Sequence, residues 1–416
     1  MATVLWAKII IAVSLGLLAI PAFFKPLNHQ LMKSSPIRLS LVFLLTRLSA
    51  FCVVFVIAGI RVPTDILAYF YPQAVLVNNG QIPIQDFETS YNIGFPALLS
   101  LATAIYDSPL AVMVLMIMAE ALAFYLIADL SSRFLEKAYH RVLTLWLINP
   151  LSFIFIALGG QDEALVVLIV SAACWCMWQG WRNGIAIILV SGFLVTKIIT
   201  LMVFVVGLAF PMKKIYRAML PLLAISIGLL IFSSTLDFPL VGAKNEVGNI
   251  TSGNIWAVLM LINPDWPAGE SWQYFLFPLV FLPLLIFSLF GRRDEPDKIM
   301  RLWALVGAVF MMTSPKSFGM YAVMFMPGFL FVADCSRQLQ RLFLLIVFFP
   351  LLVIEQALWF YLGEQNALSS PWLMIIADLF LLFGHALIVL NSLGGRGKGK
   401  VEQTSPQRFL LEAPSK

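Results

Sequence analysis

Runs of roughly twenty apolar residues, each long enough for a helix to cross the hydrocarbon core of a membrane, recur along the chain. The 416 residues are 61% hydrophobic and only 12% charged. A soluble chain has about a quarter charged residues. The sequence therefore predicts an all-α fold, a polytopic bundle of transmembrane helices.

The formal charge of +5 does not indicate a nucleic-acid partner. The basic residues lie in short loops and in a tail, where they match lipid headgroups and the excess of Lys and Arg in cytoplasmic loops. Cys174 and Cys176 are separated by one residue, and the chain has only three histidines. A redox motif or a metal site built of histidines is therefore not expected.

About eleven membrane spans fit the apolar runs. They lie near residues 3–24, 39–60, 109–131, 142–158, 163–180, 218–234, 273–291, 299–314, 318–335, 341–361 and 372–394. Loops rich in Lys and Arg face the cytoplasm. The loops that alternate with them along the chain, which have few Lys and Arg residues, therefore face outward. These outer loops are 61–108, 159–163, 235–272, 314–317 and 362–371.

Two apolar stretches do not fit as ordinary spans. Residues 94–107 are too short to cross, and we expect a surface helix within the first outer loop. Residues 184–210 have basic residues at both ends, which predicts a broken, re-entrant hairpin from the cytoplasmic side with Lys197 near its tip. Residues 1–394 then form one membrane domain, and residues 395–416 form a flexible cytoplasmic tail.

The first outer loop contains three candidate carboxylates. Asp65 follows a predicted span directly, and Asp86 and Glu88 come about twenty residues later. A carboxylate at the edge of a bilayer is partly desolvated, which raises its basicity and suits a general base. Outer loops are also polar because they are exposed to water. For Glu88, exposure to water explains the carboxylate as well as a functional role does.

A second candidate group lies around the turn Gly159–Glu163, which ends in Gln161, Asp162 and Glu163. Lys197 lies within an apolar segment, where a charge costs at least about 2.5 kcal/mol and therefore indicates function. Its expected partner is an anion, either a lipid phosphate or an acidic side chain such as Asp162. Lys316 provides a second cation on the outer face.

Arg47 and Glu120 also lie inside predicted spans, at similar depth. A charged residue within a membrane span pairs with another charge or with backbone carbonyls. We expect these two to form a structural ion pair.

In their order along residues 39–215, these motifs resemble the GT-C superfamily of integral membrane glycosyltransferases, especially the mannosyltransferase-like families that use polyprenyl-phosphate sugars. The resemblance rests on Asp65 with Tyr69, Gly80 with Pro83, Asp86-Phe87, Tyr91, Phe95 to Leu98, Asn149-Pro150, Gly160 to Glu163, and Gly192 with Lys197. A looser similarity continues through Ser314-Pro315-Lys316, Tyr321 and Pro327.

The resemblance implies transfer of one sugar from a polyprenyl-phosphate donor to a lipid-linked or glycan acceptor, with inversion. It makes Asp65 the base or the acid that orients the acceptor, and Lys197 or Lys316 the holder of the donor phosphate. The candidate catalytic residues are Asp65, Asp86, Glu88, Asp162 and Glu163. The candidate substrate-binding residues are Tyr69, Tyr91, Gln161, Lys197 and Lys316.

The second outer loop lacks a clean Asp-x-Asp motif, so no metal ligand is assigned and dependence on Mg²⁺ or Mn²⁺ stays open. The expected location is a bacterial inner membrane, with the site on the periplasmic face. A transporter or flippase for a lipid-linked sugar is the main alternative, because broken helices and intramembrane charges also mark transport sites. An O-antigen ligase or polymerase is disfavoured, because the long outer loop comes early in the chain and is acidic.

Overall fold

The computed structural model describes residues 2–24, 35–134, 137–197, 251, 253–263, 265–266, 296–369 and 371–393, together with residues 206 and 283. Within these ranges the chain is helical and no strand forms; one isolated bridge joins Pro83 and Phe87. The predicted all-α class is therefore confirmed for the described residues.

The longer helices follow most of the predicted spans. They are α1 (Ala2–Phe24), α3 (Pro36–Phe51), α6 (Pro109–Phe134), α7 (Lys137–Leu147), α8 (Glu163–Trp178), α9 (Arg182–Leu194), α15 (Pro296–Thr313), α16 (Ala322–Cys335), α18 (Phe349–Ser369) and α19 (Pro371–Leu393). Shorter helices connect or cap them: α4 (Tyr71–Asn78), α5 (Gly94–Ile105), α13 (Ile255–Ile262) and α17 (Gln338–Leu342).

Four helical stretches of the described chain are long and apolar enough to cross a membrane, which makes this a helical membrane protein. They are Pro36–Ile57, Pro109–Ser132, Gln338–Leu362 and Pro371–Leu393. Five further apolar helices are shorter, among them Glu163–Trp178 and Gly319–Cys335. The count of about eleven spans therefore remains a prediction.

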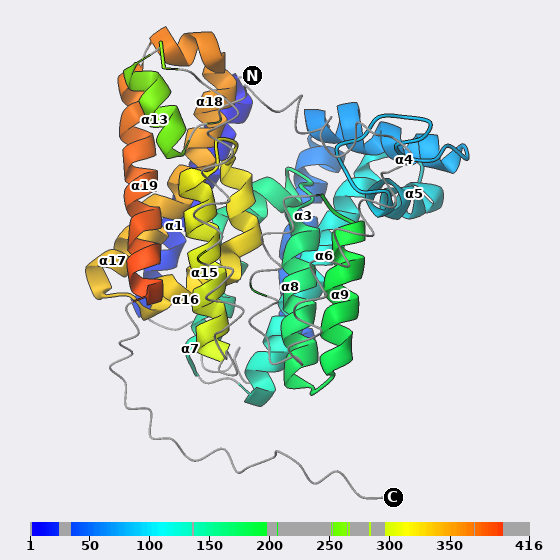
Figure 1. The fold of residues 1–416 in the computed structure, drawn as a ribbon, viewed down its shortest axis with the longest axis horizontal. Helices are drawn as coiled ribbons and strands as arrows, with labels where there is room; N and C mark the ends of the chain where they lie inside the picture. Colours follow the sequence, from blue (N-terminus) through cyan, green and yellow to red (C-terminus); the bar gives the residue numbers. More distant parts are fainter. Residues whose placement is uncertain are drawn as a thin grey trace, which may run out of the picture.

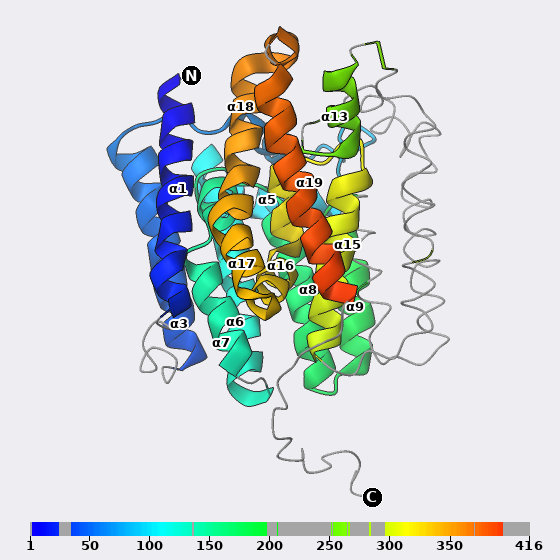
Figure 2. The ribbon, with the colours of Figure 1, turned by 90° about the vertical axis from the view of Figure 1, so that its left-hand side faces the viewer.

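The segments predicted to face outward and those predicted to face the cytoplasm lie at opposite ends of the helical bundle. α4 and α5 lie across one end, as Figure 1 shows, and this agrees with the surface helix predicted at residues 94–107. The start of α1, the helix α13, the end of α18 and the start of α19 lie at the same end (Figures 1 and 2). The α8–α9 turn lies at the opposite end (Figure 1). For these segments the arrangement matches the sidedness that the basic residues predict.

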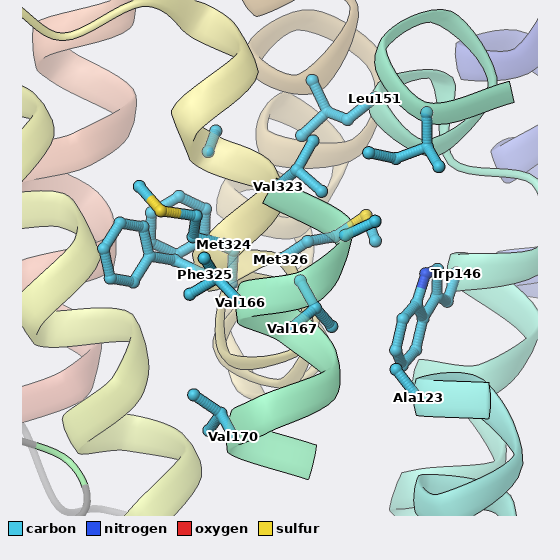
Figure 3. Close-up of a cluster of buried hydrophobic side chains, with 14 of the residues drawn as sticks. Ala123, Trp146, Leu151, Val166, Val167, Val170, Val323, Met324, Phe325 and Met326 are labelled. Atoms are coloured by element: carbon cyan, nitrogen blue, oxygen red, sulfur yellow. The ribbon is translucent and has the colours of Figure 1, made fainter. Parts of the chain in front are cut away.

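α8 lies in the middle of the bundle and is buried on nearly all sides. Its side chains Val166 and Val167 lie between the side chains of α16 and Trp146 of α7 (Figure 3). α8 also packs against α6 and α9. Because its neighbours surround it, the position of its first residue, Glu163, is firmly set.

Several helices contain π-helical segments where predicted spans approach the outer loops. Three of the four such segments in the described chain lie next to or within these loops: η1 (Cys52–Ile57) and η3 (Ser152–Ala157) precede an outer loop, and η2 (Ile66–Phe70) lies within the first one. π-Helical bulges occur frequently at functional sites. The predicted span 142–158 is interrupted at Asn149, whose side chain accepts a hydrogen bond from the backbone of Leu151 at 2.9 Å.

Some predicted elements lie outside the described residues. These are the spans 218–234 and 273–291, the second arm of the hairpin beyond residue 197, most of the loop 235–272 and the tail 395–416.

Candidate functional site

A lysine and two buried carboxylates form the centre of the site. Lys197 Nζ lies 3.0 Å from Asp162 Oδ1 and 2.9 Å from Glu163 Oε1. The carboxylates are 1% and 0% exposed and the lysine side chain 14%. The predicted partnership of Lys197 with an acidic side chain is therefore confirmed, and a second acid joins it.

Two tyrosines enclose the ammonium group. Lys197 Nζ lies 5.6 Å from the centroid of the Tyr91 ring and 5.0 Å from that of Tyr321, within the range of cation–π attraction. The Tyr91 hydroxyl donates to Asp162 Oδ1 at 3.4 Å. Burial and the Asp162 carboxylate together raise the pKa of Tyr91 well above its ordinary value, so its hydroxyl remains a proton donor at neutral pH.

Asp65 joins this centre through the second loop. Gln161 Nε2 donates to Asp65 Oδ2 at 3.0 Å, which links the first outer loop to the turn that carries the buried acids. Gly160 makes this approach feasible, because its φ is +62° and a Cβ there would lie 2.9 Å from both Ile66 Cδ1 and Met113 Cγ. Only glycine fits both the conformation and the space.

The end of α9 is fastened to the first outer loop, and this fixes Lys197. The side chain of Asn92 donates to the Phe193 carbonyl at 2.6 Å, and its backbone N–H donates to the Thr196 carbonyl at 2.9 Å. A Cβ on Gly94 would lie 2.5 Å from the Leu194 carbonyl oxygen. The loop and the helix end therefore meet backbone to backbone.

We expect Gly94→Ala to lower stability by about 1–3 kcal/mol, because the added methyl group overpacks a rigid contact. The measurement is the thermal midpoint of the purified protein in detergent. Leu101→Ala in the same helix is the control. Leu101 is 65% exposed, so its substitution should change the midpoint much less. An equal or smaller effect of the glycine substitution would contradict the tight contact.

Lys316 is the second cation of the site. Burial and, to a smaller extent, the positive charge of Lys197 lower its pKa to about 8, although the negative charge of Asp65 acts in the opposite direction. Lys316 therefore interacts electrostatically with both halves of the site. Its Nζ also lies 5.7 Å from the centroid of the Phe318 ring.

Three of the predicted site residues lie apart from this group. Asp86 is exposed and accepts a hydrogen bond from the backbone N–H of Ile82 at 2.7 Å, so it closes a local turn. Glu88 is exposed, and Tyr69 is 58% exposed. The structure brings Asp65, Tyr91, Gln161, Asp162, Glu163, Lys197 and Lys316 together, and it leaves Asp86, Glu88 and Tyr69 at the surface.

The acidic pair fits a divalent cation only in part. Asp162 Oδ2 and Glu163 Oε2 are buried without a hydrogen-bond partner. Lys197 already occupies the other oxygen of each carboxylate. The described residues contain no group of three or more His, Cys, Asp or Glu able to hold a metal ion. Mg²⁺ is often bound by one or two carboxylates with substrate phosphates, and such shared binding is what this pair allows.

Arg47 and Glu120 lie elsewhere, in the buried contact between α3, α6 and α7. Arg47 donates to the Trp146 carbonyl at 3.0 Å and to Ser152 Oγ at 2.7 Å. The Trp146 indole donates to Glu120 Oε1 at 3.0 Å. The predicted direct ion pair does not form; the two charges are connected through Trp146, and their hydrogen bonds join the helices.

Three residues of the site were not assigned to it from the sequence. Tyr321 comes from a short helix far away in the sequence. Asn92 donates hydrogen bonds to backbone carbonyls, and no sequence motif indicates such contacts. Lys8 in α1 is half-buried and feels the charge of Asp65. For Lys8 a signal was present, because it is a lone cation within an apolar run.

Comparison of the sequence with models of known families and with curated proteins finds no match. The fold and site therefore define the class of the protein by themselves. It is an all-helical membrane protein with a buried lysine–carboxylate centre near one end of its bundle, beside two helices that lie across that end.

Proposed function

We propose that the protein is a membrane glycosyltransferase. It moves a single, mannose-like sugar from a polyprenyl-phosphate donor to a lipid-linked or glycan acceptor on the non-cytoplasmic face, with inversion at the anomeric carbon. The proposal rests mainly on the hydrogen bond from Gln161 to Asp65, because Gln161 directly precedes the buried acids Asp162 and Glu163. Through Gln161, a half-buried carboxylate is held beside the buried lysine–carboxylate centre, at the bundle end that the loops predict to be outer.

The proposed reaction is a single displacement. The acceptor hydroxyl attacks the anomeric carbon, and the bond between that carbon and the phosphate oxygen breaks. Asp65 takes the hydroxyl proton as general base. The electron pair of the broken bond leaves with the phosphate as polyprenyl phosphate, whose growing charge requires fixed cations nearby.

Lys316 suits the phosphate better than Lys197 does. Two carboxylates already pair with Lys197, so that group of three carries a net negative charge when all are ionised. An anion is repelled by such a group unless another cation is present. Lys316 interacts with Lys197 and Asp65, which places its charge within range of both substrates. The role of Lys197 is then to hold the acids and Tyr91 in place.

An apolar groove next to the centre suits the donor chain. It has a volume of about 620 Å³, within the range of small-molecule sites. Its lining includes Leu41, Leu44, Leu115, Leu122, Leu165 and Val195. Two of its lining residues, Leu165 and Val195, lie two residues along the chain from Glu163 and Lys197 of the centre. It follows α6 from Leu115 to Tyr125, about 15 Å of helix, enough for the first units of an isoprenoid chain.

The role of Lys316 predicts a pH dependence. Its pKa of about 8 lies below that of an ordinary lysine, so the cation is present at pH 7 and is lost as pH rises through about 8. We expect kcat/KM for the donor to fall above that pH, because this ratio reports the free enzyme. In Lys316→Arg the fall should disappear, because the guanidinium stays charged. An identical profile in both proteins would exclude Lys316 from the phosphate site.

The decisive experiment supplies the purified protein with polyprenyl-phosphate sugars in lipid nanodiscs and measures release of polyprenyl phosphate. Release that depends on an acceptor supports transfer. Movement of a fluorescent lipid-linked sugar across vesicles, without release from any donor, would instead establish the transporter. Comparing lipid-linked glycans in cells with and without the protein then identifies the sugar and the acceptor.

A further inference from the structure

A second apolar groove lies on the other side of α3. It has a volume of about 370 Å³ and is lined by α1, by the end of α3 with η1, and by η3. Its lining residues include Ile11, Ser49, Ala50, Val53, Phe153 and Leu158. Ser49 supplies the one polar side chain of this lining, so a hydrated glycan gains little there, whereas a hydrocarbon chain is buried favourably.

This groove borders the segments that lie next to the carboxylate that we assign as base. Leu158 lines the groove and is followed along the chain by the turn that carries Gln161, the hydrogen-bond partner of Asp65. Lys8 lies one helical turn before Ile11, which lines the groove, and Lys8 interacts electrostatically with Asp65. The lining of the first groove, by contrast, includes Val195, which lies two residues along the chain from Lys197.

α3 therefore separates two apolar grooves that approach the same site from different sides. A displacement reaction needs the attacking oxygen and the anomeric carbon about 3–3.5 Å apart. Two lipid-borne substrates meet this condition when each chain has its own groove and both headgroups reach the centre. One groove near the lysine–carboxylate centre and another near the base provide this arrangement.

We infer that the acceptor is itself anchored by a hydrocarbon chain, and that this chain lies in the groove between α1, α3 and η3. The inference rests on the proposed transfer reaction and narrows its acceptor to the lipid-linked class. A glycan or protein acceptor without a lipid has no use for this groove. A bilayer phospholipid is the competing occupant.

The test uses the full chain in nanodiscs with a donor that supports release. Two acceptors are compared, a decyl and a methyl glycoside of the same sugar. Partition into the bilayer lowers KM for any long-chain acceptor, whether or not its chain binds the groove. A variant that blocks the groove therefore distinguishes groove binding from partition. Val53 is 55% exposed and lines the groove, so Val53→Trp blocks it at little cost to folding.

Val53→Trp should raise KM for the decyl acceptor about tenfold and leave KM for the methyl acceptor and the donor unchanged. Leu122→Trp, at a 48% exposed position in the first groove, is the matched control and should raise KM for the donor instead. Ser49→Trp repeats the block should Val53→Trp fold poorly.

An unchanged decyl KM in both blocked variants would overturn the inference and indicate a bilayer phospholipid in the groove. Transfer to the methyl acceptor as efficient as to the decyl acceptor would overturn it as well. Either result leaves the proposed transfer intact. Absence of polyprenyl phosphate release by the unmodified protein would instead remove the proposed function.

Discussion

Asp65→Asn is expected to lower kcat for sugar transfer by about 10²- to 10⁴-fold, the usual contribution of a general base. The asparagine keeps the size of the side chain, and its amide oxygen still accepts the hydrogen bond from Gln161. The loop geometry should therefore survive while the proton acceptor is lost. The measurement is steady-state release of polyprenyl phosphate, with the thermal midpoint recorded for the same sample.

Asp107→Asn is the matched control for this variant. Asp107 lies in the same outer loop, is exposed, and accepts a hydrogen bond from Tyr71 at 2.8 Å, away from the centre. Its substitution should leave kcat within about twofold, because a surface change away from special features has little effect. If Asp65→Asn retained the activity of the control, another group would have to accept the proton.

The sequence was sufficient to predict the elements whose cause is local. Apolar length predicted the helices, and the shortness of residues 94–107 correctly predicted a helix lying across the bundle end. The interruption at Asn149 also has a local cause that could have been predicted. The residue before a proline avoids the helical conformation, and Pro150 follows it.

Which residues meet in space was predictable only where charge required it. A lysine within an apolar segment needs an anion, so the energetics of burial predicted either a lipid phosphate or an acidic side chain such as Asp162, and the structure shows the pair with Asp162. The contact of Tyr321 with Lys197 could not be predicted, because α8 and α16, the helix that begins directly after Tyr321, are buried on most sides and their patterns do not indicate which neighbours they contact. For Asp86 the chemistry of the residue suggested function, whereas a nearby backbone N–H uses the carboxylate to close a turn.

Lys197→Ala is expected to destabilise the protein by about 3–5 kcal/mol, because it leaves two buried carboxylates without their cation. Such a loss is a large part of the total stability of a domain, about 5–15 kcal/mol. The folded fraction after extraction and the thermal midpoint measure it. Lys197→Arg keeps the charge but changes the geometry of the pairing, so its loss should be smaller.

A triple variant separates this stabilising role from a direct role in donor binding. Replacing Asp162 by Asn, Glu163 by Gln and Lys197 by Met removes all three charges together. The folded fraction should recover, because apolar or neutral groups of similar volume often replace a buried ion pair at no cost. Activity should recover only in part if the acids also align the substrate.

Transfer that stays absent in a well-folded triple variant would assign chemistry to the charged group itself. Near-normal transfer would show that Lys197, Asp162 and Glu163 serve the fold alone, and that Asp65 and Lys316 suffice for the reaction. Lys197→Ala with an unchanged midpoint would contradict the coupled burial of the three charges. In that case a raised donor KM would return the lysine to the phosphate site, the role that the resemblance implies for it.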